Sequence, residues 1–320
     1  MKSLIKIFFA VSVILFLSCD EAFDPYGDWQ DRFAFTCILK SDTTYQAAVL
    51  TKGYRPDGYD PYTYTIDPAV MHADLRILYN DSVYIFRDTT VIRSDTSRYN
   101  TPFHYYYNNK FKVSTRKTIE VEVLLSNGKR LRAQSFTPDQ INFEDRSEVI
   151  VPPVSSTIVQ FYWNSHSDGT FFQPVLIFNY KQNIGGTIVE KKRKVPVKYI
   201  QQNGSLVPVF PAPSASVSIV YELDAITKVL QEISEGDPDK QNYTILQKLE
   251  FDLIAFDQPA SRYVSSTSGL SDDLTVTVDV PDYTNIDGGL GVFGSYYKKK
   301  YDRLRFLQDY IESFGYNFLQ

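Results

Sequence analysis

Cysteine and histidine are nearly absent from this chain, and their scarcity excludes several classes of protein at once. Among 320 residues there are two cysteines, Cys19 and Cys37, and three histidines. One pair of cysteines cannot build a disulfide framework, and a lipid on Cys19 would leave Cys37 without a disulfide partner. The histidines, His72, His104 and His166, lie far apart, and none has a partner at zinc-ligand spacing. The sequence therefore predicts neither a disulfide scaffold nor a zinc site.

The chain also lacks an excess of basic residues. It contains 33 Lys and Arg against 38 Asp and Glu, a formal net charge of −5. Nucleic-acid binding requires a basic face, so we expect no nucleic-acid partner. The motifs of common catalytic sites are missing as well: there is no GxSxG elbow, no HExxH, and no cysteine with a plausible histidine base. We therefore predict a protein that is not an enzyme and carries no cofactor.

Long apolar runs are absent except at the N-terminus, where Leu4–Leu17 is almost entirely apolar. This run is too short for a stable membrane span, which needs about 20 residues. It has the length and the positive head of a secretory signal. Ser18 followed by Cys19 resembles a lipobox, the signal for attaching lipid to a bacterial cysteine, although Phe16 and Leu17 fit that pattern loosely.

These features predict that residues 1–18 are removed, that Cys19 carries the lipid, and that residues 19–31 form a tether. The predicted location is the cell envelope, as an outer-membrane lipoprotein that faces either the periplasm or the exterior. The alternatives are an ordinary signal peptide with a chance cysteine, or a short membrane anchor.

Aromatic residues are abundant, with 24 Tyr and 22 Phe. Aromatic and β-branched residues favour strands, and short alternating segments separated by Asn, Asp and Gly favour β-sandwiches. We predict a mostly-β chain of two immunoglobulin-like β-sandwich domains, at 32–138 and 139–320. Apolar residues at helical spacing predict helices near 222–234 and 298–314, both in the second domain.

Several segments together resemble a known family. They are CDEAFDPY at the predicted lipidation site, IDPAVMHADLRI, the boundary at Pro138, Trp163 at a strand end, and TNIDGGLGVFGSYY near the C-terminus. This combination is similar to a family of Bacteroidetes lipoproteins known only as a domain of unknown function, commonly encoded beside TonB-dependent outer-membrane receptors. The resemblance implies two β-domains, an envelope location and a role beside such a receptor. It implies no catalytic residues.

Two loop-like motifs call for a choice between a structural and a functional interpretation. GGLGVFGSYY lacks the lysine of a phosphate loop, so we interpret its glycines as points of close backbone approach, with Leu290, Val292 and Phe293 filling a core. DYTNID offers Asp282, Thr284 and Asn285 as oxygen ligands, which half fits a calcium loop. A solvated turn is the alternative for that segment, and the prediction for metals is none.

Cys37 and the tyrosine-rich segments complete the candidate residues. Cys37 alternates with apolar neighbours, which predicts a small buried hydrophobe on a strand; a reactive thiol is the alternative. Tyrosines cluster in GYRPDGYDPYTY and FHYYYNN, which we interpret as loops. Exposed aromatics suit protein or sugar contacts, whereas local packing is the alternative. The candidate contact residues are Tyr54, Tyr59, Tyr62, Tyr64, Tyr105, Tyr106 and Tyr107.

Two functions follow as hypotheses. The first is a non-catalytic envelope lipoprotein that acts as an interaction module, with a TonB-dependent outer-membrane receptor as its partner and the lipid on Cys19 as its membrane contact. The second is a surface lipoprotein that binds or hydrolyses glycans. A cleft with two facing carboxylates and a Tyr or Trp platform would favour the second function.

Overall fold

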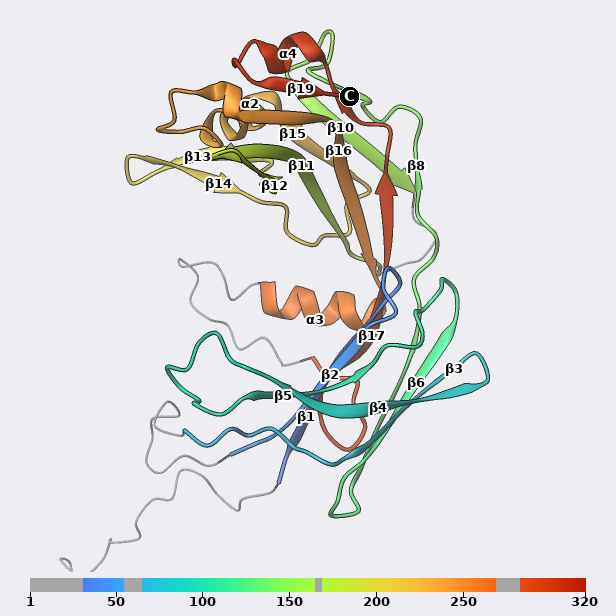
Figure 1. The fold of residues 1–320 in the computed structure, drawn as a ribbon. Coiled ribbons are helices and arrows are strands. Elements are labelled where there is room, and N and C mark those ends of the chain that lie inside the picture. The colour runs from blue at the N-terminus through green and yellow to red at the C-terminus, as the bar shows by residue number, and fades with distance from the viewer. Residues whose placement is uncertain (1–30, 55–64, 165–168, 269–282) are drawn as a thin grey trace, which may run out of the picture.

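The computed structural model describes residues 31–54, 65–164, 169–268 and 283–320 (Figure 1). Its composition of 51% strand and 10% helix confirms the prediction of a mostly-β chain. The predicted leader and all of the predicted tether except Asp31 lie outside the described residues. Within the described ranges, no helix has both the length and the apolar character that crossing a membrane requires.

Within the described residues, the N-terminal half consists of strands and the segments between them, and it occupies the lower part of Figure 1. Alternating burial along these strands, as in the strict buried and half-buried pattern of β1, follows from the two-residue period of extended backbone. The strands are β1 (Phe33–Lys40), β2 (Gln46–Lys52), β3 (Asp74–Tyr79), β4 (Ser82–Val91), β5 (Phe103–Asn108), β6 (Thr118–Leu124) and β7 (Arg130–Phe136).

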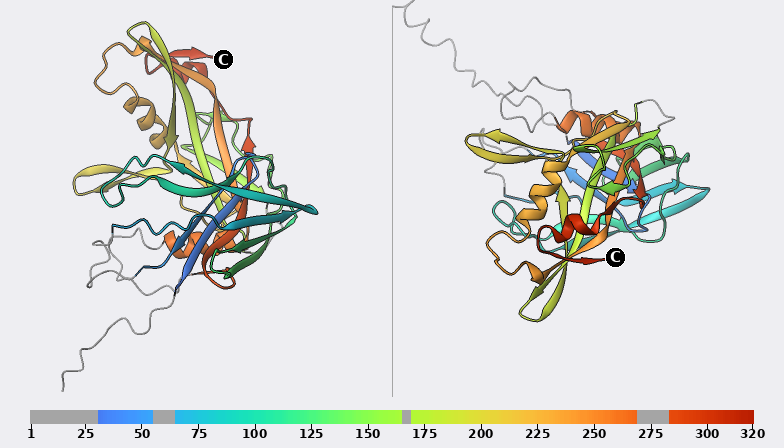
Figure 2. Two further views of the ribbon diagram at one scale, coloured as in Figure 1. Left: turned by 60° about the horizontal axis from the view of Figure 1, so that its bottom comes forward. Right: turned by 90° about the horizontal axis from the view of Figure 1, so that it is seen from above.

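The C-terminal half has longer strands and all the described helices, and its β11–β12 hairpin extends away from the body in both views of Figure 2. Its first elements are β8 (Asn142–Phe143), β9 (Ile150–Val151), β10 (Ile158–Asn164), β11 (Phe172–Ile184), β12 (Thr187–Val195), β13 (Lys198–Gln202), β14 (Ser205–Val209) and β15 (Ser218–Glu222). The remaining elements are α2 (Leu223–Glu232), η2 (Lys240–Asn242), β16 (Tyr243–Phe256), α3 (Gln258–Ser268), β17 (Leu290–Tyr301), β18 (Arg305–Phe306), α4 (Gln308–Glu312) and β19 (Asn317–Leu319).

One continuous sheet of fourteen strands joins the two halves. Its main order is β12-β11-β16-β17-β1-β2-β5-β4-β3-β6-β7. Strand β17 is the link, because residues 290–296 pair with β1 in parallel while residues 296–301 pair with β16 in antiparallel fashion. At the far edge, Arg132 of β7 exchanges two backbone hydrogen bonds with Asp287, at 3.1 and 2.7 Å. The N-terminal part of the sheet thus curls back onto the segment that leads into β17.

Two hydrophobic clusters lie along this sheet. One gathers residues from 141–316, around Phe161, Phe178 and Phe251. The other gathers residues of the N-terminal half and is completed by Ile286 and Phe293, from the segment that leads into β17 and from β17 itself. The division into two immunoglobulin-like sandwiches, at 32–138 and 139–320, remains a prediction, because strands of both ranges share one sheet.

The C-terminal glycine segment has the mechanical role that the sequence predicts. Gly291 has φ +103°, and a Cβ there would lie 2.2 Å from the carbonyl oxygen of Phe35. Only glycine permits this approach of β17 to β1. Val292 and Phe293 are fully buried, as predicted, but Leu290 is 39% exposed, so the prediction that it fills the core is wrong.

The two predicted helices have different outcomes. The helix near 222–234 is confirmed as α2, which buries Ile226, Val229 and Leu230. The helix predicted at 298–314 is wrong: β17 continues to Tyr301 because its backbone pairs with β16, and only the five residues of α4 are helical. The apolar residues that suggested the long helix are nevertheless buried, since Leu304, Phe306 and Ile311 reach the C-terminal cluster from β18, α4 and the turn before them.

Candidate interaction surface

Strand β5 and the residue before β2 present a group of aromatic rings on the outer face of the sheet. We define the tyrosine patch as Tyr45, Phe103, Tyr105 and Tyr107, all of them partly exposed. The sequence FHYYYN forms a strand rather than the predicted loop, so alternate residues point in opposite directions. Phe103, Tyr105 and Tyr107 therefore share one face.

The rings of the tyrosine patch pack against one another. Tyr45 stacks on Tyr107 with ring centroids 5.6 Å apart, and Phe103 stacks on Tyr105 at 6.1 Å. The hydroxyls of Tyr45 and Tyr105 are hydrogen-bonded at 2.8 Å. Burial and then this hydrogen bond raise the pKa of Tyr45, so its hydroxyl stays protonated at neutral pH. Stacking therefore covers one face of each of the four rings.

Tyr106 does not belong to this surface, and its assignment as an exposed contact residue is wrong. Its side chain is 2% exposed and lies in the N-terminal cluster. Its hydroxyl donates to the carbonyl of Val70 at 2.8 Å and accepts from the amide of Ala73 at 3.1 Å. Burial raises the pKa of Tyr106. The strand period decides this outcome, since a residue between two outward tyrosines must point inward.

A second aromatic group with two arginines extends the patch. The Arg93 guanidinium lies 5.2 Å from the ring centroids of both Tyr99 and Phe103. Arg98 lies 5.0 Å from the Tyr99 ring and 5.7 Å from the Tyr54 ring, and it donates to the Tyr54 hydroxyl. Cation–π contacts of this kind fix arginine side chains at low entropic cost, which is typical of residues at protein interfaces.

Tyr54 also lines a cavity of about 600 Å³ at the end of β2. Charged side chains form part of its wall: Lys52 is paired to Asp31 at 3.0 Å, and Asp67 accepts from Arg93. Of the remaining predicted contact and lipidation residues, Cys19, Tyr59, Tyr62 and Tyr64 lie outside the described residues.

The structure brings two of the three histidines to one carboxylate, a proximity that their sequence separation conceals. The Nδ1 atoms of His72 and His104 lie 3.6 and 3.8 Å from the two carboxylate oxygens of Asp88. The His72 amide also donates to Asp88 at 3.0 Å. In the part of the chain that the structure describes, no three His, Cys, Asp or Glu side chains are placed to hold a metal ion. The third histidine, His166, lies outside this part.

The two remaining residue predictions concern DYTNID and Cys37. The Asn285 side chain spans the backbone of Phe293, donating to its carbonyl at 2.7 Å and accepting from its amide at 2.9 Å. The Thr284 hydroxyl accepts from the Ile286 amide, so both oxygens have backbone partners; Asp282 lies outside the described residues. Cys37 is confirmed as a buried hydrophobe at 1% exposure, and burial raises the pKa of its thiol, which opposes reactivity.

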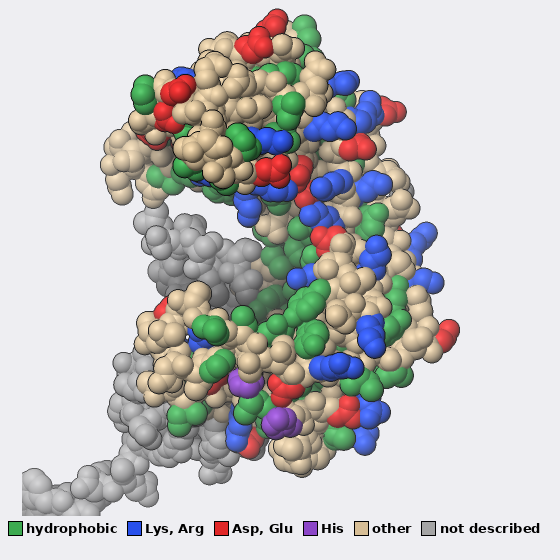
Figure 3. Space-filling view, viewed as in Figure 1, with side chains coloured by type: hydrophobic (Ala, Val, Ile, Leu, Met, Phe, Trp, Pro, Cys, Tyr) green, Lys and Arg blue, Asp and Glu red, His purple; other side chains and the backbone are tan. Residues whose placement is uncertain are grey.

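The tyrosine patch, helix α3 and the strands of the C-terminal half share one face of the continuous sheet. Tyr107 of β5 lies opposite Ala47 of β2, and Ile38 of β1 lies opposite Gly294 of β17. Side chains that lie opposite each other on paired strands point to the same side, so these pairs lie on this face. A Cβ at Gly294 would meet the Ala260 amide at 3.2 Å, so α3 covers the same face at that point. Figure 1 shows α3 between the two halves, and Figure 3 shows the molecule hollowed there.

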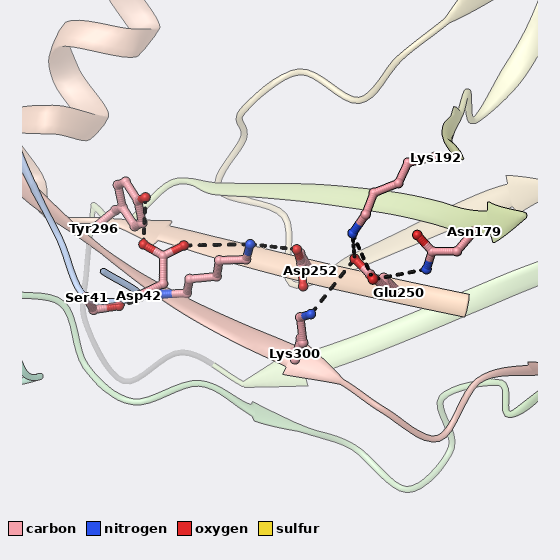
Figure 4. A network of polar contacts seen from close by, with 9 residues as sticks. Ser41, Asp42, Asn179, Lys192, Glu250, Asp252, Tyr296 and Lys300 are labelled. Carbon is pink, nitrogen blue, oxygen red and sulfur yellow. Dashed lines mark hydrogen bonds and ion pairs between the residues drawn. The ribbon is translucent and has the colours of Figure 1, made fainter. Parts of the chain in front are cut away.

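On the other side of α3, this face carries a network of charged side chains (Figure 4). Lys298 contacts Asp252 at 2.7 Å and Asp42 at 3.7 Å, and the Tyr296 hydroxyl donates to Asp42 at 2.9 Å. Burial lowers the pKa of Lys298, but its contacts with the two carboxylates outweigh burial and leave that pKa raised. Glu250 forms a second centre with Lys192, Lys300 and Asn179. The network ties the β1–β2 turn to strands of the C-terminal half.

A buried carboxylate lies where α3 meets the sheet. Asp257 is 2% exposed and accepts hydrogen bonds from the hydroxyls of Ser135 and Ser295, both at 2.8 Å, and from the Ala260 amide at 2.9 Å. Burial raises its pKa to about 6, and these hydrogen bonds oppose the rise. Because β7, β17 and the start of α3 all meet at this group, its role is structural.

Comparison with protein-family models gives no match to this chain. Comparison with curated proteins likewise gives no match.

Proposed function

We propose that this chain is a non-catalytic lipoprotein of the cell envelope that binds a partner protein through the tyrosine patch. The lipid on Cys19 is its membrane anchor, and a TonB-dependent outer-membrane receptor is the candidate partner. The anchor rests on the leader sequence, and the choice of receptor rests on the family resemblance. The binding surface rests on the geometry of the patch.

The observation that carries the proposal is the mutual stacking of the patch rings. A sugar-binding platform needs open ring faces, and stacking covers one face of each ring of the patch. Aromatic rings that are already packed together, with arginines held beside them, suit a protein interface, because little side-chain entropy is lost on binding. The patch therefore favours a protein partner over a glycan.

The test is cross-linking and purification of the full-length tagged chain from the native envelope, followed by mass spectrometry. The variant is Tyr105→Ser combined with Tyr107→Ser. The matched control is Phe136→Ser, an aromatic ring on β7 that is 56% exposed and lies outside the patch. We expect a defined partner with the wild-type chain and the control, and its loss with the double variant.

Two aromatic anchors of an interface contribute about 2 kcal/mol each when they are central, which corresponds to roughly 30-fold in affinity per residue. A partner retained equally by wild type and double variant would show that the patch is not the contact surface. A partner other than a TonB-dependent receptor would refute the choice of receptor and leave the patch assignment standing.

A further inference from the structure

A cavity of about 240 Å³ opens on the outer face of β11, apart from the tyrosine patch. Its walls include Gln173 and Val175 of β11, Lys194 of β12, and Phe210 and Pro211 from the connection after β14. This volume accommodates one small ring compound rather than a peptide or an extended chain.

The aromatic wall of the cavity is held in position from both ends. On one side, the Val197 amide donates to the Val209 carbonyl at 2.8 Å. On the other, Ser214 and Phe172 exchange backbone hydrogen bonds at 2.7 and 3.0 Å. The connecting sequence FPAPS contains two prolines, which restrict its backbone. The backbone that carries Phe210 is therefore restrained on both sides. The ring itself is 50% exposed and, unlike the rings of the patch, has no ring or cation partner within the described residues.

Two polar side chains of the cavity have no partner within the described residues. Lys194 forms no ion pair there, although its neighbours Lys192 and Arg193 are paired to Glu250 and Glu232. The amide of Gln173 likewise forms no hydrogen bond in the described structure. The cavity thus offers one ammonium donor and one amide, which both donates and accepts.

We propose that this cavity binds a single neutral hexopyranose unit, as the terminal residue of a glycan. The C–H face of the sugar ring stacks on the free face of Phe210. Its hydroxyls accept from Lys194, and the Gln173 amide, which can donate and accept, contacts a further hydroxyl. A simple anion fits less well, because it would leave the exposed ring of Phe210 and the Gln173 side-chain carbonyl without a partner. This inference uses none of the residues of the tyrosine patch and does not depend on the function proposed for it.

The test is saturation-transfer NMR on the full-length chain, in a detergent without a sugar headgroup. The probes are the methyl α-pyranosides of glucose, galactose and mannose, with glycine as a zwitterion. We expect transfer to ring protons of at least one glycoside, an affinity loss of about tenfold or more in Phe210→Ala and in Gln173→Leu, and no change in Phe136→Ala. Tyr105→Ser with Tyr107→Ser should also leave sugar binding unchanged.

Three outcomes overturn the inference: no transfer to any of the three glycosides, transfer that Phe210→Ala leaves unchanged, or transfer to glycine alone. Because Phe210 is a surface ring outside both hydrophobic clusters, its truncation should leave the fold intact, and the far-UV spectrum of the variant checks this. Failure here leaves the tyrosine patch and its protein partner untouched, since the two sets of variants do not overlap.

Discussion

Replacing Asp257 by asparagine should change how the stability of the protein depends on pH. The folded-state pKa of this carboxyl is about 6, against an ordinary value of 3.8. Between these two values the unfolded chain loses the proton while the folded chain keeps it. Stability from this group is therefore fully present below pH 3.8 and falls as the pH rises toward 6. A difference of about 2.2 pKa units corresponds to about 3 kcal/mol.

Asparagine is the suitable replacement because it keeps the shape and removes the charge. Its Oδ1 can still accept from the Ala260 amide, and its amide nitrogen can donate to the Ser135 and Ser295 hydroxyls, which can turn to accept. Carboxylates with a lowered pKa change the pH dependence of stability in the opposite direction. Glu250, for example, has a lowered pKa because its hydrogen bonds and cations outweigh its burial, so its stabilising effect is lost as the pH falls. The effect of Asp257 is therefore obtained only from the difference in the free energy of unfolding between wild type and variant.

The assay is urea unfolding of both proteins from pH 4 to pH 7.5, followed by tryptophan fluorescence, because Trp163 is buried. The stability of Asp257→Asn relative to wild type should increase by about 2.4 kcal/mol over this range, because part of the full effect is already present at pH 4. Ser295→Ala provides a further check: it removes a hydrogen bond that favours the ionised form, so its own pH dependence should be steeper than that of wild type. A wild-type-minus-variant difference that stays flat with pH would refute this reasoning.

Three further predictions concern single residues. Gly291→Ala should destabilise the protein by at least about 2 kcal/mol in urea unfolding, because of its positive φ and its contact with Phe35, whereas Gly185→Ala, with open space around it, should cost about 1 kcal/mol. Tyr106→Phe should cost about 1–2 kcal/mol in the same assay through the lost hydroxyl contacts, whereas Tyr107→Phe should stay within about 0.5 kcal/mol. Cys19→Ala should move the chain from the membrane to the soluble fraction and remove the lipid mass from its N-terminus, whereas Cys37→Ala should do neither; an unmodified Cys19 thiol in the wild type contradicts the anchor.

Local periodicity predicted the elements whose structure depends on local sequence. The mostly-β class, helix α2 and the buried Cys37 all follow from the spacing of apolar residues in one segment. The same reasoning failed at 298–314, because apolar residues at helical spacing can also be gathered into a core by a strand, a turn and a short helix. Backbone pairing of β17 with β16 prevailed there, and that pairing joins residues about 45 positions apart.

Helix α3 was not predicted, although its start carries a recognisable signal. Asp257 precedes Gln258-Pro259, and an aspartate cap followed by an early proline is typical of a helix N-terminus. Helix α3 was missed because its apolar residues show only weak helical spacing. The aromatic segment FHYYYN forms a strand, although we predicted a loop. A strand assignment would have placed Tyr106 on the opposite face from Tyr105 and Tyr107.

Features that depend on long-range register could not be predicted from the sequence. Asp252 and Val175 are adjacent only because β11 and β16 pair, and His72 and His104 meet at Asp88 only because β4 and β5 pair beside the preceding connection. No spacing in the sequence reports these contacts.

The shared strand β17 gives the two proposed binding surfaces a fixed relation. The cavity with Phe210 and the tyrosine patch lie on the same face of one hydrogen-bonded sheet, on opposite sides of α3. A flexible linker between two separate domains would let these surfaces move independently. Here Gly291 and Gly294 hold β17 tightly against β1 and α3, and Lys298 joins Asp42 to Asp252 across the two halves. A glycan at the cavity and a protein at the patch would therefore be held at a set separation, on one side of the molecule.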